Sequence, residues 1–369
     1  MMTHSIYSYS LCIALPLMLF LGFYFLFAST PEKAIFVNYL RSRRIMGAAL
    51  LLLAANYAVH FFFEIRFWNV HAAILMNLST YFLCYWLFSS ALTTLLDRFY
   101  ITRRRFRVHV CQWLLFTALS GVVLLTFPEG VAQKVGLLSM GVWLMTYGFI
   151  LARRLILAYR RAVRLFDDTH SDDIGAYIRW LSVFTYCAVI FGVGCSVLTF
   201  LPDEYIYIWV LSSVPFYIYL YCAYMNYLLF YEQVEQAFEQ EMPSEGETPE
   251  ATAGGELPAC YAGIEEKLSV WIKEGGYLTK GLTLKELSDL LKTNRTYLSA
   301  YIKTAYRASF REWIAGLRVE YAKDLLIQHR ELTIADVAER SGFQSASHFI
   351  RLFKERENCS PARWRKNRL

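Results

Sequence analysis

The amino-acid sequence predicts an all-α protein in which a seven-helix transmembrane bundle precedes a cytoplasmic double helix-turn-helix domain. Three observations predict this fold. Hydrophobic residues make up 56% of the chain and charged residues only 18%, which is typical of a protein that is partly embedded in a membrane. Long apolar runs are confined to residues 1–231, whereas two helical repeats of ordinary polarity occupy residues 261–369. An acidic segment, residues 232–260, separates these two parts.

Seven apolar stretches in residues 1–231 are long enough to cross the roughly 30 Å hydrocarbon core of a bilayer. Buried helices of a globular protein are the alternative. Seven such runs in succession, joined by short charged loops, argue against that alternative. The predicted spans are Ile6–Ala28, Ile45–Phe63, Ala72–Leu96, Val108–Phe127, Val135–Ala158, Trp180–Leu201 and Tyr205–Tyr231.

The charges of the loops predict the orientation of these spans. The loops after the first, third and fifth spans are rich in Lys and Arg, whereas the intervening loops carry only Arg66 and Lys134. Positively charged loops stay in the cytoplasm. We therefore expect the N-terminus outside and the C-terminal domain in the cytoplasm of a bacterium, with the spans in its inner membrane. No Lys or Arg precedes Lys33, so the first span lacks the basic start of a signal peptide and is expected to be retained.

A few polar side chains at membrane depth are candidates for a signal site. Ionisable and amide residues are rare in spans because burying them in lipid costs free energy, so they are functional candidates by default. One interpretation is a ligand pocket. The alternative, which the pattern favours, is hydrogen bonding between helices together with aromatic anchoring at the membrane interfaces. The candidate pocket residues are Asn56, His60, Asn77, Tyr217, Tyr221, Tyr224 and Asn226.

The sequence offers little support for catalysis or for a bound metal. It contains no paired carboxylates, nucleophile triad or phosphate-binding loop in the predicted spans. Its eight cysteines are scattered without a C-x-x-C or Cys/His cluster, which disfavours a zinc site. We expect these cysteines to be reduced packing residues, and we expect no enzymatic activity, no metal and no cofactor.

The acidic segment predicts a flexible linker. Residues 232–260 hold eight acidic and no basic residues, and from Glu239 onward they are rich in Pro, Gly, Ser and Thr. Such a composition cannot bury enough apolar surface to fold. Its negative charge should also keep it away from anionic lipid and nucleic acid.

Residues 261–369 contain a weak internal repeat that predicts two helix-turn-helix units. Each copy opens with a capping-box pattern, Thr283 with Glu286 in the first and Thr333 with Asp336 in the second. Apolar residues at helical spacing follow, then a turn, and then a second helix. Between the copies, Phe310–Gln328 has the apolar spacing of one long connecting helix. Leu298, Phe349, Phe353 and Trp364 are expected in the core.

Several motifs in this part occur in the order and spacing of one family. They are "YLS" at Tyr297–Ser299, "RVEYAKDLL" in the connecting helix, "ADVAERSGFQSASHFIRLFKE", and the closing "CSPARWR". The segment from about Tyr261 to Leu369 resembles the DNA-binding domain of the AraC/XylS family of transcription regulators. Two positions depart from the family pattern: Lys292 stands where Gly is usual in the first turn, and Asn358 stands where Gly is common before "SP".

The resemblance implies how this domain would read DNA. The connecting helix would hold two recognition helices about 34 Å apart, one turn of duplex, so that both enter successive major grooves. Arg351 is the strongest candidate, because Arg pairs bidentately with guanine, although a surface salt bridge is the alternative. By position, the base-facing residues are Arg295, Thr296, Ser299, Ala300, Ala346, Ser347, Ile350 and Arg351. Phosphate contacts are expected from Lys303, His348, Lys354, Arg356, Arg363, Arg365, Lys366 and Arg368, with solvated charges as the alternative for the tail.

These features together indicate a membrane-bound transcription regulator, with activation as the favoured mode. The expected partners are double-stranded DNA, the lipid bilayer, RNA polymerase and an unidentified small-molecule or protein signal. Dimerisation as a homodimer, changed exposure of the linker and proteolytic release are alternative couplings among which the sequence does not choose. Two other classes stay open: a transporter or membrane enzyme fused to an autoregulatory DNA-binding domain, and a helical domain that binds protein instead of DNA.

Overall fold

A computed structural model describes residues 2–30, 36–97, 99–128, 130–171, 205–239 and 262–368, with six single positions between 182 and 194. The chain divides into two compact units. The first, which we call the bundle, comprises Met1–Ala162 and Tyr177–Gln233. The second, which we call the C-terminal unit, comprises Val163–Ala176 and Val234–Leu369.

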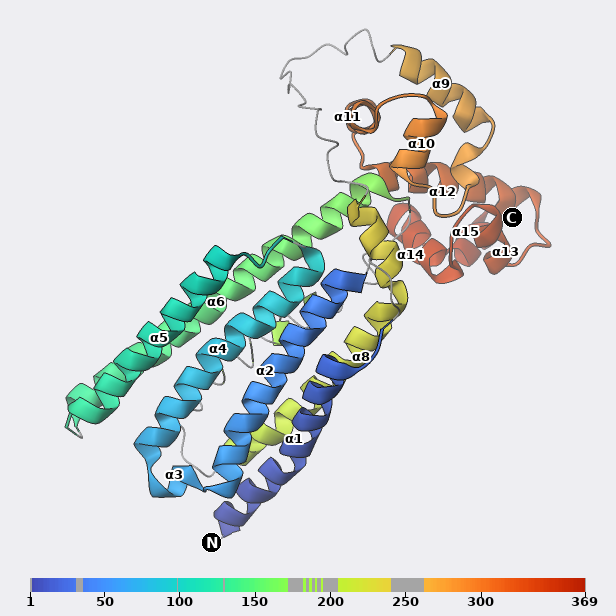
Figure 1. Ribbon diagram of the computed structural model, residues 1–369. Coiled ribbons are helices and arrows are strands. Elements are labelled where there is room, and N and C mark those ends of the chain that lie inside the picture. Colours follow the sequence, from blue (N-terminus) through green and yellow to red (C-terminus); the bar gives the residue numbers. More distant parts are fainter. Residues whose placement is uncertain are drawn as a thin grey trace. The chain divides into compact units, whose positions relative to one another are not determined.

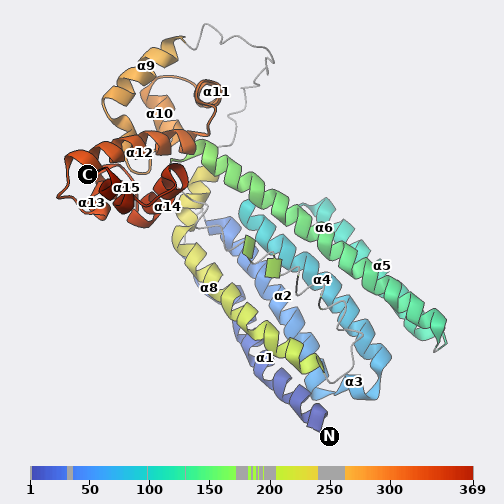
Figure 2. The ribbon, with the colours of Figure 1, turned by 180° about the vertical axis from the view of Figure 1, so that it is seen from behind.

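The bundle consists of long helices joined by short loops (Figure 1). Consecutive long helices run in opposite directions, and α8 lies beside α1 in both views (Figures 1 and 2). Contacts join α1 to α2, α2 to α4 and α4 to α5. The bounds are α1 Met2–Phe27, α2 Val37–Phe62, α3 Ile65–Trp68, α4 Val70–Leu96, α5 Arg103–Thr126, α6 Val131–Thr169 and α8 Ile206–Glu239. The last residues of α6 and α8 belong to the C-terminal unit.

Stacked aromatic rings join α4, α5 and α6. Phe82 of α4 lies between Phe116 of α5, at 4.6 Å between ring centroids, and Tyr147 of α6, at 4.1 Å. All three side chains are buried within one apolar cluster that the three helices share. Aromatic stacking and apolar packing of this kind fix the neighbours of α4.

Five of these helices are long and apolar enough to cross a membrane, and they correspond to the first five predicted spans. All five begin earlier than the predicted spans, most clearly α2 and α5, and α6 also continues past Ala158. Hydropathy marks only the apolar part of a helix, whereas backbone hydrogen bonding continues through the flanking polar residues. The predicted span Trp180–Leu201 lies almost wholly outside the described residues. The last predicted span coincides with α8, which is not among the five, so the count of seven stays a prediction.

The boundary of the predicted linker also shifts. Helix α8 continues to Glu239, so residues 232–239, assigned to the linker from their acidity, are helical. Acidic residues and Gln are compatible with helix, and only the Pro- and Gly-rich part that follows argues against it. Residues 240–261 lie outside the described residues.

The C-terminal unit contains two helical cores that share one helix, as the internal repeat predicts. The first core combines α9, α10, α11 and the start of α12, and includes Leu298. The second combines the rest of α12 with α13, α14 and α15, and includes Phe349, Phe353 and Trp364. The connecting helix α12 has the predicted bounds. The elements are α9 Ala262–Lys273, η4 Gly276–Leu278, α10 Leu284–Leu290, α11 Arg295–Tyr306, α12 Phe310–Gln328, α13 Ile334–Arg340, α14 Ala346–Glu357 and α15 Pro361–Asn367.

Both predicted capping boxes form. The Thr283 hydroxyl accepts from the backbone N–H of Glu286, and the Glu286 carboxylate accepts from the backbone N–H of Thr283 at 2.8 Å. Thr333 and Asp336 make the same exchange at the start of α13, and the hydroxyl of Thr333 lowers the pKa of the Asp336 carboxyl. The folded-state pKa of this carboxyl therefore lies below its unfolded-state pKa. The stabilisation by this cap is complete at neutral pH and is lost in acid, as the pH falls through the folded-state pKa.

Lys292 occupies the left-handed conformation, with φ of 52°. Asn358 does so too, with φ of 56°, but Asn tolerates this region better than Lys. We therefore expect Lys292→Gly to raise the opening free energy of α10 and α11 by about 0.5–1 kcal/mol, after the entropy cost of Gly is included. Hydrogen–deuterium exchange of the full chain in detergent measures this quantity. Asn358→Gly is the matched control and should gain less; an equal gain at both positions would contradict the argument.

Candidate functional site

The two predicted recognition helices begin with capped, solvent-facing first turns. The Asn294 side chain accepts from the backbone N–H of Thr296 at 2.7 Å at the start of α11. The Ser345 hydroxyl accepts from the backbone N–H of His348 at 3.2 Å at the start of α14. These caps fix the first turns, where the predicted base-facing residues begin. Neither cap was anticipated, although Asn or Ser before a helical pattern is an ordinary N-cap signal.

Helix α11 presents its predicted residues on one side. Thr296 is exposed, and Arg295, Ser299 and Ala300 are half-buried. Arg295, Ser299 and Lys303 follow each other at intervals of four, so they lie along one face. Leu298 and Ile302 are fully buried on the adjoining face, about 100° round the helix axis. The helix therefore has one face in the core and one row of polar side chains beside it.

Helix α14 is divided in the same way. Ser347 and Ile350 are exposed, whereas Ala346 packs partly against the second core. Arg351 is half-buried, and its Nε lies 4.0 Å from a carboxylate oxygen of Glu355, one turn further along. An ion pair this long and this exposed contributes little. It would not prevent Arg351 from turning toward a base.

The predicted phosphate-binding residues have several different environments. Arg356 of α14 donates to the backbone carbonyl of Glu312 at 2.6 Å. Arg365 of α15 donates to that of Leu332 at 2.9 Å, so each residue joins its helix to the rest of the unit. His348 is half-buried with its ring edge-on to Phe343. Lys303 pairs with Asp168. The remaining predicted phosphate residues are exposed: Lys354, Arg363, Lys366 and Arg368.

A short segment, residues 276–279, lies against both helical cores. Arg318 of α12 is 1% exposed and donates from Nε to the carbonyl of Tyr277 at 2.8 Å and from Nη2 to that of Thr279 at 2.7 Å. On the other side, the Gly342 turn approaches the carbonyl of Leu278 so closely that a Cβ would lie 2.5 Å from it. Segment 276–279 thus joins the turn of the second repeat to α12. Sequence analysis missed Arg318, because nothing in a helical pattern distinguishes a buried Arg from an exposed one.

Three of the candidate pocket residues in the bundle meet. His60 Nε2 lies 2.9 Å from Asn77 Oδ1, and Asn56 Nδ2 donates to Asn77 Oδ1 and to Thr80 Oγ1, both at 3.2 Å. The four side chains are buried, and the ring of Tyr7 packs edge-on to His60. Asn56 Oδ1 and His60 Nδ1 have no hydrogen-bond partner among the described residues. Thr80 and Tyr7 were not anticipated.

The other candidate pocket residues lie elsewhere. Tyr224 is fully buried, and its hydroxyl lies 2.9 Å from that of Ser42, fourteen positions before Asn56 on α2 and so about 21 Å away along the helix. Tyr221 packs on Tyr24 at 5.2 Å between ring centroids. Tyr217 is buried in α8, and Asn226 is exposed. The seven residues therefore form no single cluster, since Tyr224 and the amide–histidine group lie about four helical turns apart along α2.

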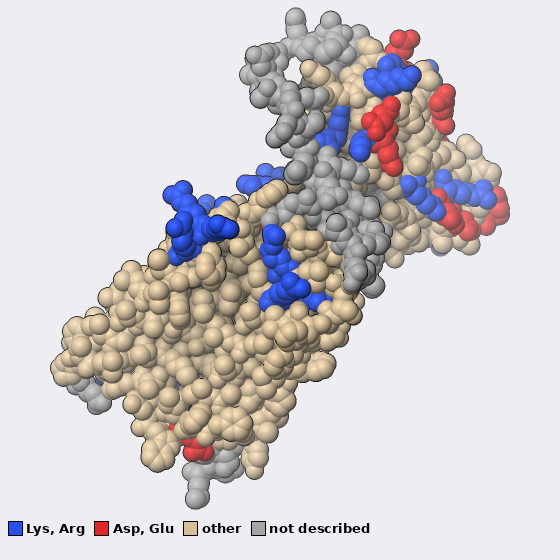
Figure 3. Space-filling view, in the orientation of Figure 1, with Lys and Arg blue, Asp and Glu red and all other residues tan. Residues whose placement is uncertain are grey.

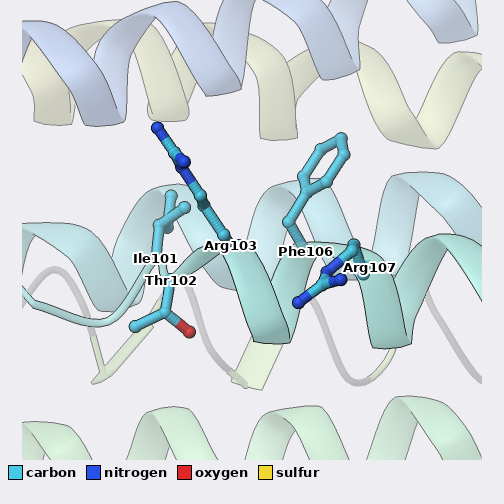
Figure 4. Close-up of a pocket in the computed structure, with 5 residues that line it drawn as sticks. All are labelled: Ile101, Thr102, Arg103, Phe106 and Arg107. Carbon is cyan, nitrogen blue, oxygen red and sulfur yellow. The ribbon is translucent and has the colours of Figure 1, made fainter.

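Basic residues gather at one end of the bundle, where the loops predicted to be cytoplasmic lie (Figure 3). At this end, an open pocket of about 600 Å³ lies at the start of α5. Figure 4 shows Arg103 and Phe106 reaching to the same side of the helix. The pocket combines cationic and apolar surface, and its lining residues are Ile101, Thr102, Arg103, Phe106 and Arg107. Among the described residues of the chain, no group of three His, Cys, Asp or Glu could hold a metal ion.

Residues 287–367 match the family model for a helix-turn-helix domain. The C-terminal unit contains a helix-turn-helix domain. This match begins within α10 and ends in α15, so it includes the two predicted recognition helices. It agrees with the resemblance inferred from the sequence motifs for this part of the chain.

Several proteins named as transcriptional regulators or activators are similar to about a quarter of this chain. The chain is 32% identical over 101 residues to the virulence regulon transcriptional activator VirF of Yersinia enterocolitica, which is 27% of this chain and 36% of that protein. It is 34% identical over 89 residues to the HTH-type transcriptional regulator YobQ of Bacillus subtilis, 24% of this chain and 36% of YobQ. With YtdP of the same organism the identity is 32% over 87 residues, 24% of this chain and 11% of YtdP. The matches span little more than a third of these relatives at most. No solved structure shows a significant match.

Proposed function

We propose that this chain is a membrane-embedded, sequence-specific DNA-binding regulator of transcription that couples a membrane or envelope signal to gene expression. The observation that supports this most directly is the pair of capped recognition helices, α11 and α14, held by one connecting helix within a helix-turn-helix domain. Activation is the favoured mode, and one of the similar proteins carries the name of a transcriptional activator. RNA polymerase is the partner that activation would require.

The proposed site of action is the cytoplasmic face of a bacterial inner membrane. Five helices of the bundle are long and apolar enough to cross a bilayer, and Lys and Arg gather at one end of it (Figure 3). Positive charge stays on the cytoplasmic side. The pocket of Arg103, Phe106 and Arg107 suits that boundary, because anionic lipid head groups and acyl chains meet there.

We place signal reception in the buried group of Asn56, His60, Asn77 and Thr80. If His60 donates through Nε2 to Asn77, then His60 Nδ1 and Asn56 Oδ1 are both acceptors without a described partner. Buried unpaired acceptors cost free energy. A ligand with a hydrogen-bond donor would satisfy them. Asn56→Ala and His60→Ala should therefore abolish induction of a reporter while leaving the protein in the membrane, and unchanged induction would remove this group from consideration.

Arg351→Ala tests the proposed DNA recognition. We expect the variant to lose about 1–3 kcal/mol of discrimination, roughly 5- to 150-fold, at one base pair of the preferred site. The measurement is selection of bound sequences from a pool of genomic fragments by the full chain in nanodiscs, followed by affinities for the selected site and its point variants. Arg330→Ala removes the same charge from an exposed position just after the connecting helix and is the control.

Two outcomes would contradict the proposal at this point. If the full chain selected no sequence, DNA recognition would be wrong. If Arg351→Ala and Arg330→Ala gave the same preference and affinity as the wild type, α14 would not read DNA through Arg351.

A further inference from the structure

The end of α6 contacts the helix-turn-helix domain through several polar interactions. Residues 163–176 belong to the same compact unit as that domain. Asp167 lies 2.6 Å from Nη1 of Arg311, at the start of α12, and Asp168 lies 2.5 Å from Nζ of Lys303 on α11. Two neighbouring carboxylates thus neutralise two cations of the first repeat.

Backbone pairing continues this contact beyond the helix. His170 pairs with Thr283 in an antiparallel bridge, and the backbone N–H of Ser171 donates to the carbonyl of Leu282 at 3.0 Å. Ser171 is 1% exposed, and its hydroxyl accepts from Nη2 of Arg318 at 3.4 Å. Burial lowers the pKa of His170 to about 4, so the imidazole is neutral where it packs. The end of α6 and the residues after it therefore contact the domain through backbone pairing and a buried hydrogen bond as well as through the two ion pairs.

One of the cations that this contact occupies, Lys303, lies where DNA is expected. Lys303 continues the row of Arg295 and Ser299 along α11, one turn beyond the predicted base-facing residues. A Lys in that position faces the phosphate backbone when the first turn enters a groove. In the structure, the ammonium group of Lys303 donates to a carboxylate oxygen of Asp168, as it would to a phosphate oxygen.

We propose that the end of α6 and the DNA backbone compete for one surface of the first helix-turn-helix unit, formed by Lys303 and Arg311. When Asp167 and Asp168 hold this surface, the first recognition helix lacks its phosphate contacts. When α6 withdraws, DNA phosphates replace Asp167 and Asp168 as partners of these cations. This inference rests on the proposed DNA-binding function and gives it a route of control, because α6 is one of the five helices able to cross the membrane.

The length of α6 fits this role. Its 39 residues extend about 58 Å at 1.5 Å per residue, whereas the hydrocarbon core is roughly 30 Å thick. Even a tilted span leaves several turns outside the bilayer. A shift or rotation of the span would therefore be transmitted along one continuous helix to Asp167 and Asp168.

The test compares the affinity of charge variants of the full chain in nanodiscs for a random-sequence duplex at low salt. Asp167→Asn/Asp168→Asn keeps the shape of both side chains and removes the competing charges. We expect it to bind duplex about 5- to 10-fold more tightly than the wild type. Two additional phosphate contacts should also steepen the slope of log affinity against log salt by about 2. Glu266→Gln/Glu274→Gln removes two exposed charges, one from α9 and one from the residue that follows it, and is the matched control.

A double-mutant cycle separates competition from a general charge effect. In a background of Lys303→Gln/Arg311→Gln, the two Asp substitutions should no longer change duplex affinity, because their partners are absent. If they raised affinity equally in both backgrounds, or if the α9 control matched them, the proposal would be overturned.

A covalent lock provides the converse measurement. Residues paired across an antiparallel bridge have Cα atoms about 4.5–5.5 Å apart, which a disulfide can span. Oxidised His170→Cys/Thr283→Cys should bind duplex about 5-fold more weakly than the same protein after reduction, whereas neither single Cys variant should respond to reductant. Equal affinity of the locked and reduced forms would overturn the proposal. If no variant, locked or open, bound any duplex, the proposed function itself would fail.

Discussion

Replacing Arg318 with Met should destabilise the C-terminal unit by about 3 kcal/mol. The substitution preserves most of the side-chain volume but removes the donors to the carbonyls of Tyr277 and Thr279. Both carbonyls would then be left without these partners in a place where Arg318 itself is 1% exposed. Hydrogen bonds to a charged donor are the strong ones, and a buried acceptor left unsatisfied costs the free energy of its desolvation.

Hydrogen–deuterium exchange of the full chain measures this effect helix by helix. We expect loss of protection in α12 and in segment 276–279, with the bundle unchanged. Arg330→Met removes an exposed guanidinium from the same unit and should change the opening free energy by less than about 0.5 kcal/mol. If Arg318→Met were as well protected as Arg330→Met, segment 276–279 would not depend on Arg318.

Gly342→Ala should cost about 2–4 kcal/mol and should release the second repeat from segment 276–279. Two causes add at this position. The residue has φ of 80°, which strains any residue with a Cβ, and that Cβ would lie 2.5 Å from the carbonyl oxygen of Leu278. Neither the turn nor the segment can move alone, because Arg318 holds the carbonyls on both sides of Leu278.

Gly275 offers a matched control for the two causes. It also has a left-handed conformation, with φ of 75°, but the nearest atom to an added Cβ would be 3.5 Å away. Gly275→Ala should therefore lose only the conformational part, about 1 kcal/mol. The opening free energies of both variants come from the same exchange experiment. Equal losses at the two positions would mean that the close approach to Leu278 contributes nothing.

Local signals in the sequence predicted much of the helix-turn-helix domain. Capping boxes at Thr283 and Thr333 and the apolar spacing of 310–328 depend on residues within one or two turns, so a single sequence displays them. The positive φ of Lys292 is another local feature, expected from the family pattern at a turn. The first five spans were predicted for the same reason, since hydropathy is summed over one helix.

Features that depend on distant residues were missed. Arg318 is buried only because segment 276–279 returns to α12, some forty residues apart in the chain. Asp167 and Asp168 lie in the loop that was predicted after the fifth span, and their partners lie on α11 and α12. The pocket prediction grouped Tyr224 with Asn56, but the two residues lie at different levels of the bundle. Knowing that a residue lies within a span does not fix its level along the helix. The base-facing assignments at Arg295 and Arg351 stay predictions.

The most direct test of the central claim is genome-wide crosslinking and immunoprecipitation of the intact protein in cells, beside its Arg351→Ala variant. A membrane fraction prepared from the same culture establishes where the crosslinked protein resides. The proposed function predicts discrete peaks from full-length protein in the membrane, weakened in the variant. No peaks from abundant full-length protein, or peaks only from a soluble fragment, would contradict a regulator that reads DNA while held in the membrane.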